Sequence, residues 1–306
     1  MNLKTRRMKT IKKGSKGEEV KLLQELLCKA GFNVVVDSDF GQKTHDAVLA
    51  YQKSKSLVAD GIVGDKTWAA LGVKEETPKP VKEVHIIMNY GHAKPTPGKR
   101  SPLYSTLSKE EQAYFAKYPQ FGTDRYYEYL SNRVIGKQIT ASLRERGWKV
   151  HEVEQTGANG LAEIANATQK IVKQFGSSNC IFISIHSNAA SAKDNGWANA
   201  KGWCIYTTKG QNKSDKLADS IYKYAKLYLQ EQDGRNIRKD TKDGDPDQEA
   251  NFYVIYHCNC PGVLTENFFF NDKEDLKYLV SEKGQNSIVR VHVMGIEDYI
   301  YNIMLK

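Results

Sequence analysis

Short apolar runs that end in a polar residue recur three times along the larger part of the chain. The runs are residues 84–92, 179–188 and 261–266. Each is rich in Val, Ile and Phe and is closed by Gly, Ser or Asn, a pattern typical of a buried β-strand. Segments with helical spacing lie between them. We therefore predict an α/β fold, with an open, twisted, mostly parallel sheet flanked by helices.

The carboxyl ends of these runs carry three residues whose side chains can bind a metal ion or transfer a proton. His92 and His186 end the first two runs, and Glu266 ends the third. Open parallel sheets bind ligands in the crevice beyond the carboxyl ends of their strands. Two imidazoles and a carboxylate that converge at such a crevice are typical of the active site of a zinc hydrolase. A charged Glu266 at the end of a buried strand is reasonable if it faces a cation or transfers a proton.

A third metal ligand is needed, because a hydrolytic zinc ion takes three protein ligands and keeps one position open for water. The segment 125–143 has an apolar helical face, and Glu128 lies in its first turn, where a carboxylate suits the helix dipole. Glu128 is therefore our candidate, and a solvated N-terminal glutamate is the alternative. Asn188, two residues after His186, either contacts substrate or serves as a cap or turn residue.

A charged segment with two prolines and no periodicity divides the chain at residues 74–83. It is typical of a semi-rigid linker, and 306 residues favour two domains. We expect a small three-helix domain at 1–73 and a catalytic domain at 84–306. In the small domain two related turns, residues 37–41 and 60–64, each precede a helix and form a weak internal repeat.

The composition is that of an ordinary globular protein, with 40% hydrophobic residues and a net charge of +9. This charge favours anionic polymers such as nucleic acid, anionic lipid or acidic bacterial wall polymers. Most lysines are single rather than in blocks, which weakens the case for nucleic acid. No apolar run has secretory or membrane-spanning length, so we expect synthesis in the cytoplasm without a signal peptide and no stable membrane association.

Five cysteines without a Cys-x-x-Cys pair make a disulfide framework improbable and favour a reducing compartment of synthesis. His257, Cys258 and Cys260 could form part of a second zinc site, but their spacing is too tight for a chelating loop. We expect His257 to line the cleft and the two cysteines to pack in the interior. The remaining histidines are expected to be structural or on the surface: His45, His85, His151 and His292.

The small domain resembles the three-helix peptidoglycan-binding domain found beside bacterial cell-wall hydrolases. The matching positions include Gly17, Val20, Leu23, Gln24, Leu27, Asp37, Phe40, Gly41, Thr44, Tyr51, Gln52, Asp60, Gly61, Thr67, Trp68 and Leu71. Most of these positions are expected to build the core. The resemblance implies that bacterial peptidoglycan is the partner of this domain, with the exposed loops at 37–41 and 60–65 as candidates for glycan contact.

Residues 84–304 resemble the zinc-dependent N-acetylmuramoyl-L-alanine amidases. The matching motifs are Gly91-His92, Glu128 with Asn132, the segment 184–188, and the segment 263–267 with Asn271. The resemblance implies that His92, Glu128 and His186 hold Zn²⁺. It also implies that Glu266 takes a proton from water and delivers it to the leaving amine, as general base and then acid.

This chain departs from the family pattern around the first ligand. Asn89-Tyr90 stands where Asp-Pro is usual, and Ala93 stands where a second Gly is usual. Residues 94–123 form an insertion between the first two ligands that could be a substrate-facing lid. Because the insertion shifts the spacing, three other residues are alternatives to Glu128 as the third ligand: Glu110, Glu111 and Asp124.

The implied activity is hydrolysis of the lactyl amide between N-acetylmuramic acid and L-alanine. The small domain would keep a monomeric enzyme on the wall and so raise the local substrate concentration. A phage endolysin released through a holin-type pore and a mother-cell autolysin both fit. The alternatives are a zinc peptidase that cuts within the stem peptide and an inactive wall-binding protein, against which both histidines and Glu266 argue.

Overall fold

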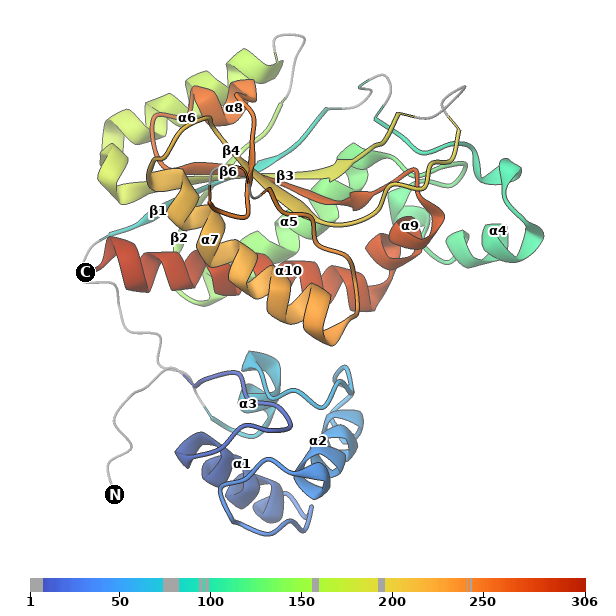
Figure 1. Cartoon of the computed structure of the whole chain (residues 1–306), viewed down its shortest axis with the longest axis vertical. Helices are drawn as coiled ribbons and strands as arrows, with labels where there is room; N and C mark the ends of the chain where they lie inside the picture. The colour runs from blue at the N-terminus through green and yellow to red at the C-terminus, as the bar shows by residue number, and fades with distance from the viewer. Residues whose placement is uncertain are drawn as a thin grey trace. The chain divides into compact units, whose positions relative to one another are not determined.

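The computed structural model describes residues 8–73, 83–93, 96, 99–155, 160–191, 196–240, 242 and 244–306. The chain divides into two compact units, Met1–Lys79 and Pro80–Lys306 (Figure 1). The expected linker at 74–83 lies outside the described residues except for Glu83.

The smaller unit has three helices around one apolar core, which confirms the predicted helical fold. The helices are α1 Glu18–Lys29, α2 Gln42–Ser54 and α3 Asp65–Ala70. Leu23 and Leu27, four residues apart on α1, are fully buried with Tyr51 of α2 and Trp68 of α3. These apolar positions bury one face of each helix, so packing rather than intrinsic propensity stabilises such short helices.

The two turns of the internal repeat are each organised by a buried glutamine. The Gln24 side-chain amide donates to Asp37 Oδ1 at 2.7 Å and to Thr44 Oγ1 at 3.2 Å. Its Oε1 accepts from the backbone N–H of Asp37 at 3.0 Å. Gln52 makes the corresponding contacts in the second turn, with Asp60, Gly61 and Thr67. The sequence repeat therefore corresponds to a repeated set of hydrogen bonds, in which a buried glutamine amide pairs with the polar groups of each turn.

The larger unit is a six-stranded sheet covered by helices. Its strands are β1 His85–Tyr90, β2 Lys149–Val153, β3 Cys180–Asn188, β4 Cys204–Thr207, β5 Gln248–Glu249 and β6 Gly262–Phe269. Its α-helices are α4 Lys109–Phe115, α5 Glu128–Glu145, α6 Gly160–Phe175, α7 Lys213–Ala225, α8 Tyr253–Tyr256, α9 Lys273–Val280 and α10 Glu282–Tyr299. The strand order is β2-β1-β3-β6-β4-β5. Only the β4–β6 pair is antiparallel, which confirms the predicted mostly parallel α/β sheet.

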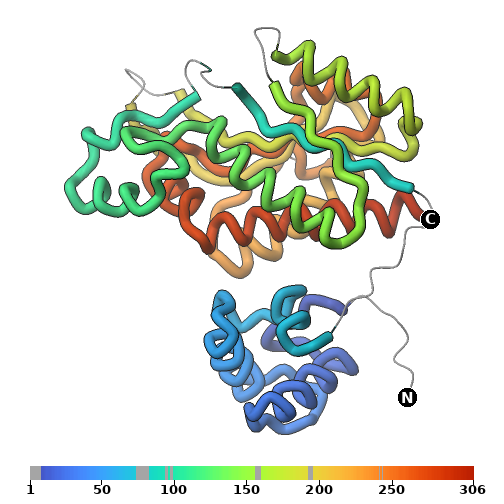
Figure 2. The backbone as a smooth tube through the Cα atoms, turned by 180° about the vertical axis from the view of Figure 1, so that it is seen from behind, coloured from blue at the N-terminus to red at the C-terminus, as the bar shows by residue number. Residues whose placement is uncertain are grey.

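Alternate residues of the central strands face two separate apolar cores. Ile86 and Met88 of β1 pack into the core that α5, α7 and α10 cover, whereas Ile87 packs with residues of α6 and α8. Figure 1 shows α6 and α8 on one face of the sheet, and Figure 2 shows α5 and α10 side by side on the other. Strands buried on both faces explain why the runs are continuously apolar.

The described part of the insertion is anchored to the body of the larger unit. Helix α4 begins with a capping box, in which Ser108 and Glu111 bond each other's backbone N–H at 3.2 and 3.0 Å. The Glu111 carboxylate also lies 3.2 Å from Lys273 Nζ at the start of α9. Tyr114 donates its hydroxyl to the Lys277 carbonyl at 3.1 Å. These contacts fix the insertion against α9.

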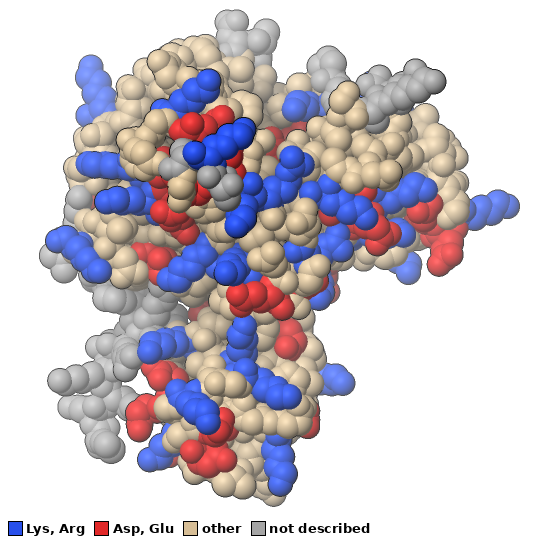
Figure 3. All heavy atoms as spheres, viewed as in Figure 1, with Lys and Arg blue, Asp and Glu red and all other residues tan. Residues whose placement is uncertain are grey.

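Charged side chains of both signs are mixed on one face of the two units. On the face seen in Figure 3, Lys and Arg are interspersed with Asp and Glu rather than gathered into one continuous basic face. Across the part of the chain that the structure describes, no helix combines the length and the apolar character needed to cross a membrane. All five cysteines are free thiols.

His292 on α10 is a buried structural histidine beneath β6. Its Nδ1 lies 2.7 Å from the Ile288 carbonyl, so Nδ1 carries the proton and Nε2 accepts from the Thr265 hydroxyl at 2.8 Å. Burial lowers the pKa of His292 to about 4. The folded protein therefore keeps this imidazole neutral over a pH range in which the unfolded chain protonates it.

The stability of the larger unit should fall as the pH drops from 6.5 toward 4, because only the unfolded state gains a proton at residue 292 in this window. The contribution that is lost amounts to roughly 3 kcal/mol at most. Calorimetric unfolding across this range should show a shallower pH dependence for His292→Gln than for the wild type. Equal slopes would contradict a neutral buried His292.

Candidate metal centre and active site

Adjacent strands bring His92 and His186 to the same edge of the sheet. The Gly91 N–H donates to the Ile185 carbonyl at 3.0 Å, which continues the β1–β3 pairing one residue beyond β1. The two imidazole rings lie with their centroids 4.8 Å apart and nearly perpendicular, at 87°. Both predicted histidines therefore occupy the carboxyl edge of the parallel strands.

The Gly91-His92 pair has a steric basis. A Cβ atom on residue 91 would lie 2.1 Å from Cε1 of the His186 ring, so only glycine lets this imidazole sit against the backbone. His92 itself has a φ of 65°, in the left-handed region that non-glycine residues rarely adopt. Strained backbone of this kind persists where the surrounding structure holds it, and it often marks a functional site.

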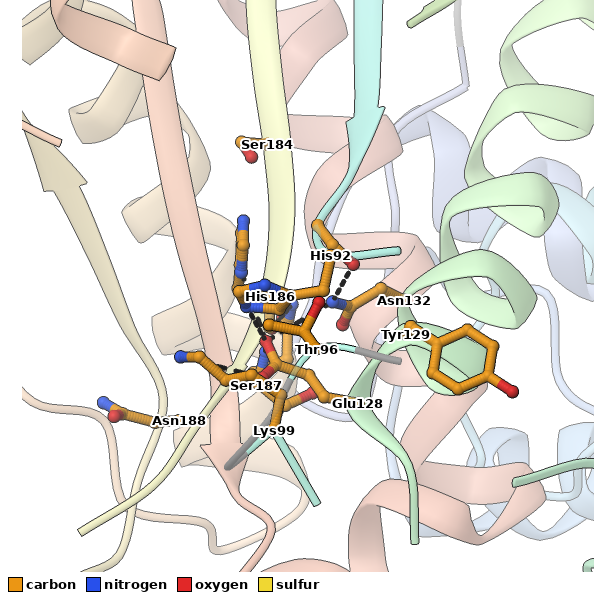
Figure 4. A network of polar contacts seen from close by, with 12 residues as sticks. His92, Thr96, Lys99, Glu128, Tyr129, Asn132, Ser184, His186, Ser187 and Asn188 are labelled. Carbon is orange, nitrogen blue, oxygen red and sulfur yellow. Dashed lines mark hydrogen bonds and ion pairs between the residues drawn. The ribbon is translucent and has the colours of Figure 1, made fainter. Parts of the chain in front are cut away.

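Glu128 joins the two histidines from the start of α5 (Figure 4). Its side chain is fully buried, and its Oε1 lies 3.1 Å from His186 Nδ1 and 3.3 Å from His92 Nε2. The same oxygen accepts from the backbone N–H of Ser187 at 3.1 Å. The first turn of α5 thus points a carboxylate at the strand ends, as its position in the sequence predicts.

Two further residues support Glu128: Asn132, which the family resemblance named without a role, and Lys99, which the sequence analysis did not single out. Asn132, one helical turn later, donates to the Gly91 carbonyl at 3.0 Å and lies 3.4 Å from Glu128 Oε1. Lys99 Nζ lies 3.9 Å from Glu128 Oε2. The helical spacing of Asn132 from Glu128 was a usable signal, since residues four apart share a face. Lys99 follows no periodic pattern.

The donor set fits a divalent metal ion. One donor atom from each of His92, Glu128 and His186 lies within 4.8 Å of the others. His92 Nε2 and Glu128 Oε2 are buried and make no hydrogen bond within the described part of the chain. Two imidazoles and a carboxylate are the ligand types of catalytic zinc. Among the described residues His257, Cys258 and Cys260 are not part of any such group.

Glu266 lies beside this cluster but is not a member of it. It is paired with His186 on β3 and with Cys204 on β4, so its side chain shares a sheet face with both. Its Oε2 is buried without a hydrogen-bond partner among the described residues. Directly after Glu266 the β3–β6 register shifts, and Phe268 has a φ of 67°. Bulges of this kind often re-aim side chains beside active sites.

The site gives its titratable groups different charges. Burial raises the pKa of Glu128, but the close contacts with His186 and His92 outweigh this effect and hold that pKa well below its ordinary value. Burial lowers the pKa of His186, which favours the neutral imidazole that metals bind. Burial, followed by the charge of Glu128, raises the pKa of Glu266 well above its ordinary value. One carboxylate is therefore held charged, and the other can carry a proton.

The alternatives to Glu128 lie elsewhere. Glu111 pairs with Lys273, and Asp124 accepts from the Tyr127 hydroxyl at 3.0 Å. Neither these residues nor Glu110 belongs to the cluster. Asn188 bonds locally, because its Oδ1 accepts from the backbone N–H of Ala189 at 2.8 Å, and Figure 4 shows it apart from the two imidazoles.

The fold and the site together define an α/β protein with a His-Glu-His centre at the carboxyl edge of its sheet. The family model described as N-acetylmuramoyl-L-alanine amidase matches residues 86–298, and the model of a peptidoglycan binding domain matches residues 16–71. The chain belongs to the N-acetylmuramoyl-L-alanine amidase family, and it carries a peptidoglycan binding domain in its smaller unit. Both predicted resemblances are confirmed.

Individual curated relatives match parts of the chain. The N-acetylmuramoyl-L-alanine amidase CwlL of Bacillus licheniformis is 39% identical over 74 residues, which are 22% of this chain and 21% of that protein. The uncharacterized protein YqiI of Bacillus subtilis is 27% identical over 178 residues, which are 56% of this chain and 77% of that protein. The match spans about a fifth of the length of the curated amidases CwlL and CwlM.

Solved structures share the fold. An N-acetylmuramoyl-L-alanine amidase from Clostridium difficile 630 superposes with a TM-score of 0.53 at 20% identity, over 72% of this chain and 99% of that chain. The catalytic domain of CwlV from Bacillus (Paenibacillus) polymyxa gives a TM-score of 0.51 at 18% identity, over 71% of this chain and 98% of that chain. These likenesses confirm the α/β architecture of the larger unit.

Gly91→Ala should weaken zinc binding by roughly ten- to hundred-fold, the size seen when groups that orient metal ligands are lost. The added methyl group would displace the His186 ring from its contact with residue 91. Competition with a chromophoric chelator measures the affinity. Gly41→Ala is the control, since a Cβ there meets nothing within 4 Å. Unchanged zinc affinity in Gly91→Ala would refute the steric role of Gly91.

Proposed function

We propose that this protein is a zinc-dependent amidase that hydrolyses the bond between N-acetylmuramic acid and L-alanine in bacterial peptidoglycan. Its family membership supports the reaction class. The observation that carries the proposal is the buried Glu128 carboxylate, which gathers His92 and His186 at the strand ends while Glu266 lies on the neighbouring strand.

Each of the two units has its own proposed function. We assign residues 1–73 to wall binding, 74–83 to the linker and 84–306 to catalysis. The family match of the smaller unit supports peptidoglycan as its ligand. Tethering the catalytic unit to an insoluble polymer raises the effective concentration of scissile bonds around it. A wall-lytic endolysin or autolysin, acting as a monomer, is the biological role that we propose.

The metal ligands in this proposal are His92, Glu128 and His186. When bound, zinc would supply Lewis acidity, which acidifies water and polarises the carbonyl of the amide. Ser187 and Asn132 hold Glu128 in place through its Oε1. Their contacts limit the freedom of the carboxylate, and ligands oriented in this way bind metal more tightly.

Glu266 is the proposed proton carrier. Its buried position and raised pKa suit a group that takes a proton from the attacking water and gives it to the leaving amine. A divalent cation in the neighbouring cluster would oppose the effect of the Glu128 charge and make the carboxylate form of Glu266 accessible. Asn188, half-buried at the end of β3, is proposed to contact substrate at the rim of the site.

Replacing Glu266 with Gln should leave zinc binding intact and lower turnover by at least roughly a hundred-fold, because the isosteric amide cannot accept the proton. Zinc content by mass spectrometry and release of soluble muropeptides from purified wall are the two measurements. His186→Ala is the companion variant, and it should lose zinc and activity together. Wall lysis that survives in Glu266→Gln would refute the role of Glu266.

The bond that is cut can be identified from the products. Mass spectrometry of muropeptides should show intact stem peptides with a free L-alanine amine and glycan strands without peptide. A chelator should stop their release. Fragments cut within the stem peptide would indicate a zinc peptidase, and no fragments at all would indicate an inactive wall-binding protein.

A further inference from the structure

A cavity of about 480 Å³ opens beside His92, between the insertion and the start of α5. Its lining includes His92, Lys99, Arg100, Asp124, Tyr127 and Tyr129. A volume of this size accommodates a short peptide segment. Because His92 also belongs to the proposed metal centre, a ligand in the cavity would be continuous with a substrate positioned over that centre.

The cations of this cavity are tied to the metal centre through the backbone. The Glu128 N–H donates to the Lys99 carbonyl at 3.1 Å, and Arg100 forms an isolated antiparallel bridge with Tyr127. The Ser101 N–H donates to the Tyr126 carbonyl at 3.0 Å. The backbone of Glu128 therefore holds Lys99, and the residues directly before Glu128 hold Arg100 and Ser101.

The positive charge of the cavity is not balanced by its own acidic residue. The Asp124 carboxylate already lies 3.2 Å from Arg125 Nε and accepts from the Tyr127 hydroxyl. Within the described residues no ion pair involves the Arg100 guanidinium. Among the described residues Lys99 forms an ion pair only with Glu128, whose Oε2 lies 3.9 Å away and would be shared with the metal. The cavity thus presents the cations of Lys99 and Arg100 to a ligand, whereas the carboxylate of Asp124 in its lining is already paired with Arg125.

The walls of the cavity are shaped for a ligand with apolar parts. The rings of Tyr127 and Tyr129 line it, with their centroids 6.1 Å apart and their planes at 61°. Gly122 forms another part of the lining, with a φ of 126°. A Cβ there would lie 2.0 Å from the Arg125 carbonyl oxygen, so only glycine permits this turn.

We propose that this cavity is a subsite for a carboxylate of the stem peptide, with Lys99 and Arg100 as the residues that determine specificity. The inference rests on the proposed amidase function, because the scissile amide must lie at the metal centre for the neighbouring residues of the peptide to reach the cavity. The ligand is the free carboxylate of an acidic residue that follows the L-alanine. The same residue in amidated form would lose the charge that the two cations recognise.

The test compares two soluble substrates whose γ-carboxyl is blocked as an N-methylamide, so that they differ only in the α-group: the N-methylamides of N-acetylmuramoyl-L-alanyl-D-isoglutamate and of its isoglutamine counterpart. Wild-type kcat/KM should favour the acid by about ten-fold, the size expected for two partly exposed charge pairs. Lys99→Ala and Arg100→Ala should each reduce the preference to roughly three-fold, and the double variant should abolish it. High salt should weaken the wild-type preference.

A binding measurement separates the subsite from the chemistry. Zinc-loaded Glu266→Gln should bind the acid about ten-fold more tightly than the amide in calorimetric titration, whether or not turnover is detected. Lys117→Ala is the matched control, because Lys117 is exposed on the same insertion and does not line the cavity. It should keep the full preference, as should the charge-conserving Lys99→Arg.

Each outcome has a distinct meaning. Equal affinity of the Glu266→Gln protein for acid and amide, or a preference unchanged by Arg100→Ala, would overturn the subsite and leave the amidase function standing. Failure of the zinc-loaded wild type to cleave either substrate or purified wall would overturn the proposed function. If Lys99→Ala loses zinc, Arg100→Ala still decides, because Arg100 makes no ion pair with Glu128 among the described residues.

Discussion

The rest of the candidate active site depends on one interaction, the contact of the buried Glu128 carboxylate with the imidazoles of His92 and His186. A charged group removed from water is strongly unfavourable unless it is paired and hydrogen-bonded. Here two imidazoles lie at 3.1 and 3.3 Å, and a backbone N–H completes the shell of Oε1. Oε2 makes no hydrogen bond within the described chain. A buried carboxylate between two imidazoles is a ligand set suited to a cation, and folding alone does not require it.

The strand order of the sheet places the two histidines close enough for Glu128 to contact both. Neighbouring parallel strands carry His92 and His186, and the next strand carries Glu266 in register with His186. The proposed proton carrier therefore stays close to the proposed metal centre without belonging to its ligand cluster. Helix α5 reaches the strand ends from one side, and the backbone of the insertion is bonded to its first residue. The proposed subsite and the proposed metal centre are therefore linked through Glu128, whose backbone N–H binds the Lys99 carbonyl.

Much of this arrangement could be predicted from the sequence, because regular structure leaves a periodic signal. Unbroken apolar runs identified β1, β3 and β6, and a helical face placed Glu128 in a first turn. The strand ends were less accurate: β1 ends at Tyr90, before His92, whereas β6 continues to Phe269, beyond Glu266. The turn repeat of the smaller unit was visible, but its physical basis in the buried amides of Gln24 and Gln52 was not. The positions of Lys99 and Arg100 could not be predicted, since they lie on irregular backbone without a period. The left-handed φ of His92 and the close packing of Gly91 against the His186 ring are features that only the fold reveals.

The central claim is that Glu128 unites His92 and His186 into one zinc site. Anomalous diffraction at the zinc edge from crystals of the full chain grown with zinc tests it directly. The account predicts a single strong zinc peak within coordination distance, about 2.0–2.2 Å, of both imidazoles and the Glu128 carboxylate. A zinc peak elsewhere with this cluster empty, or coordination that leaves Glu128 out, would contradict it.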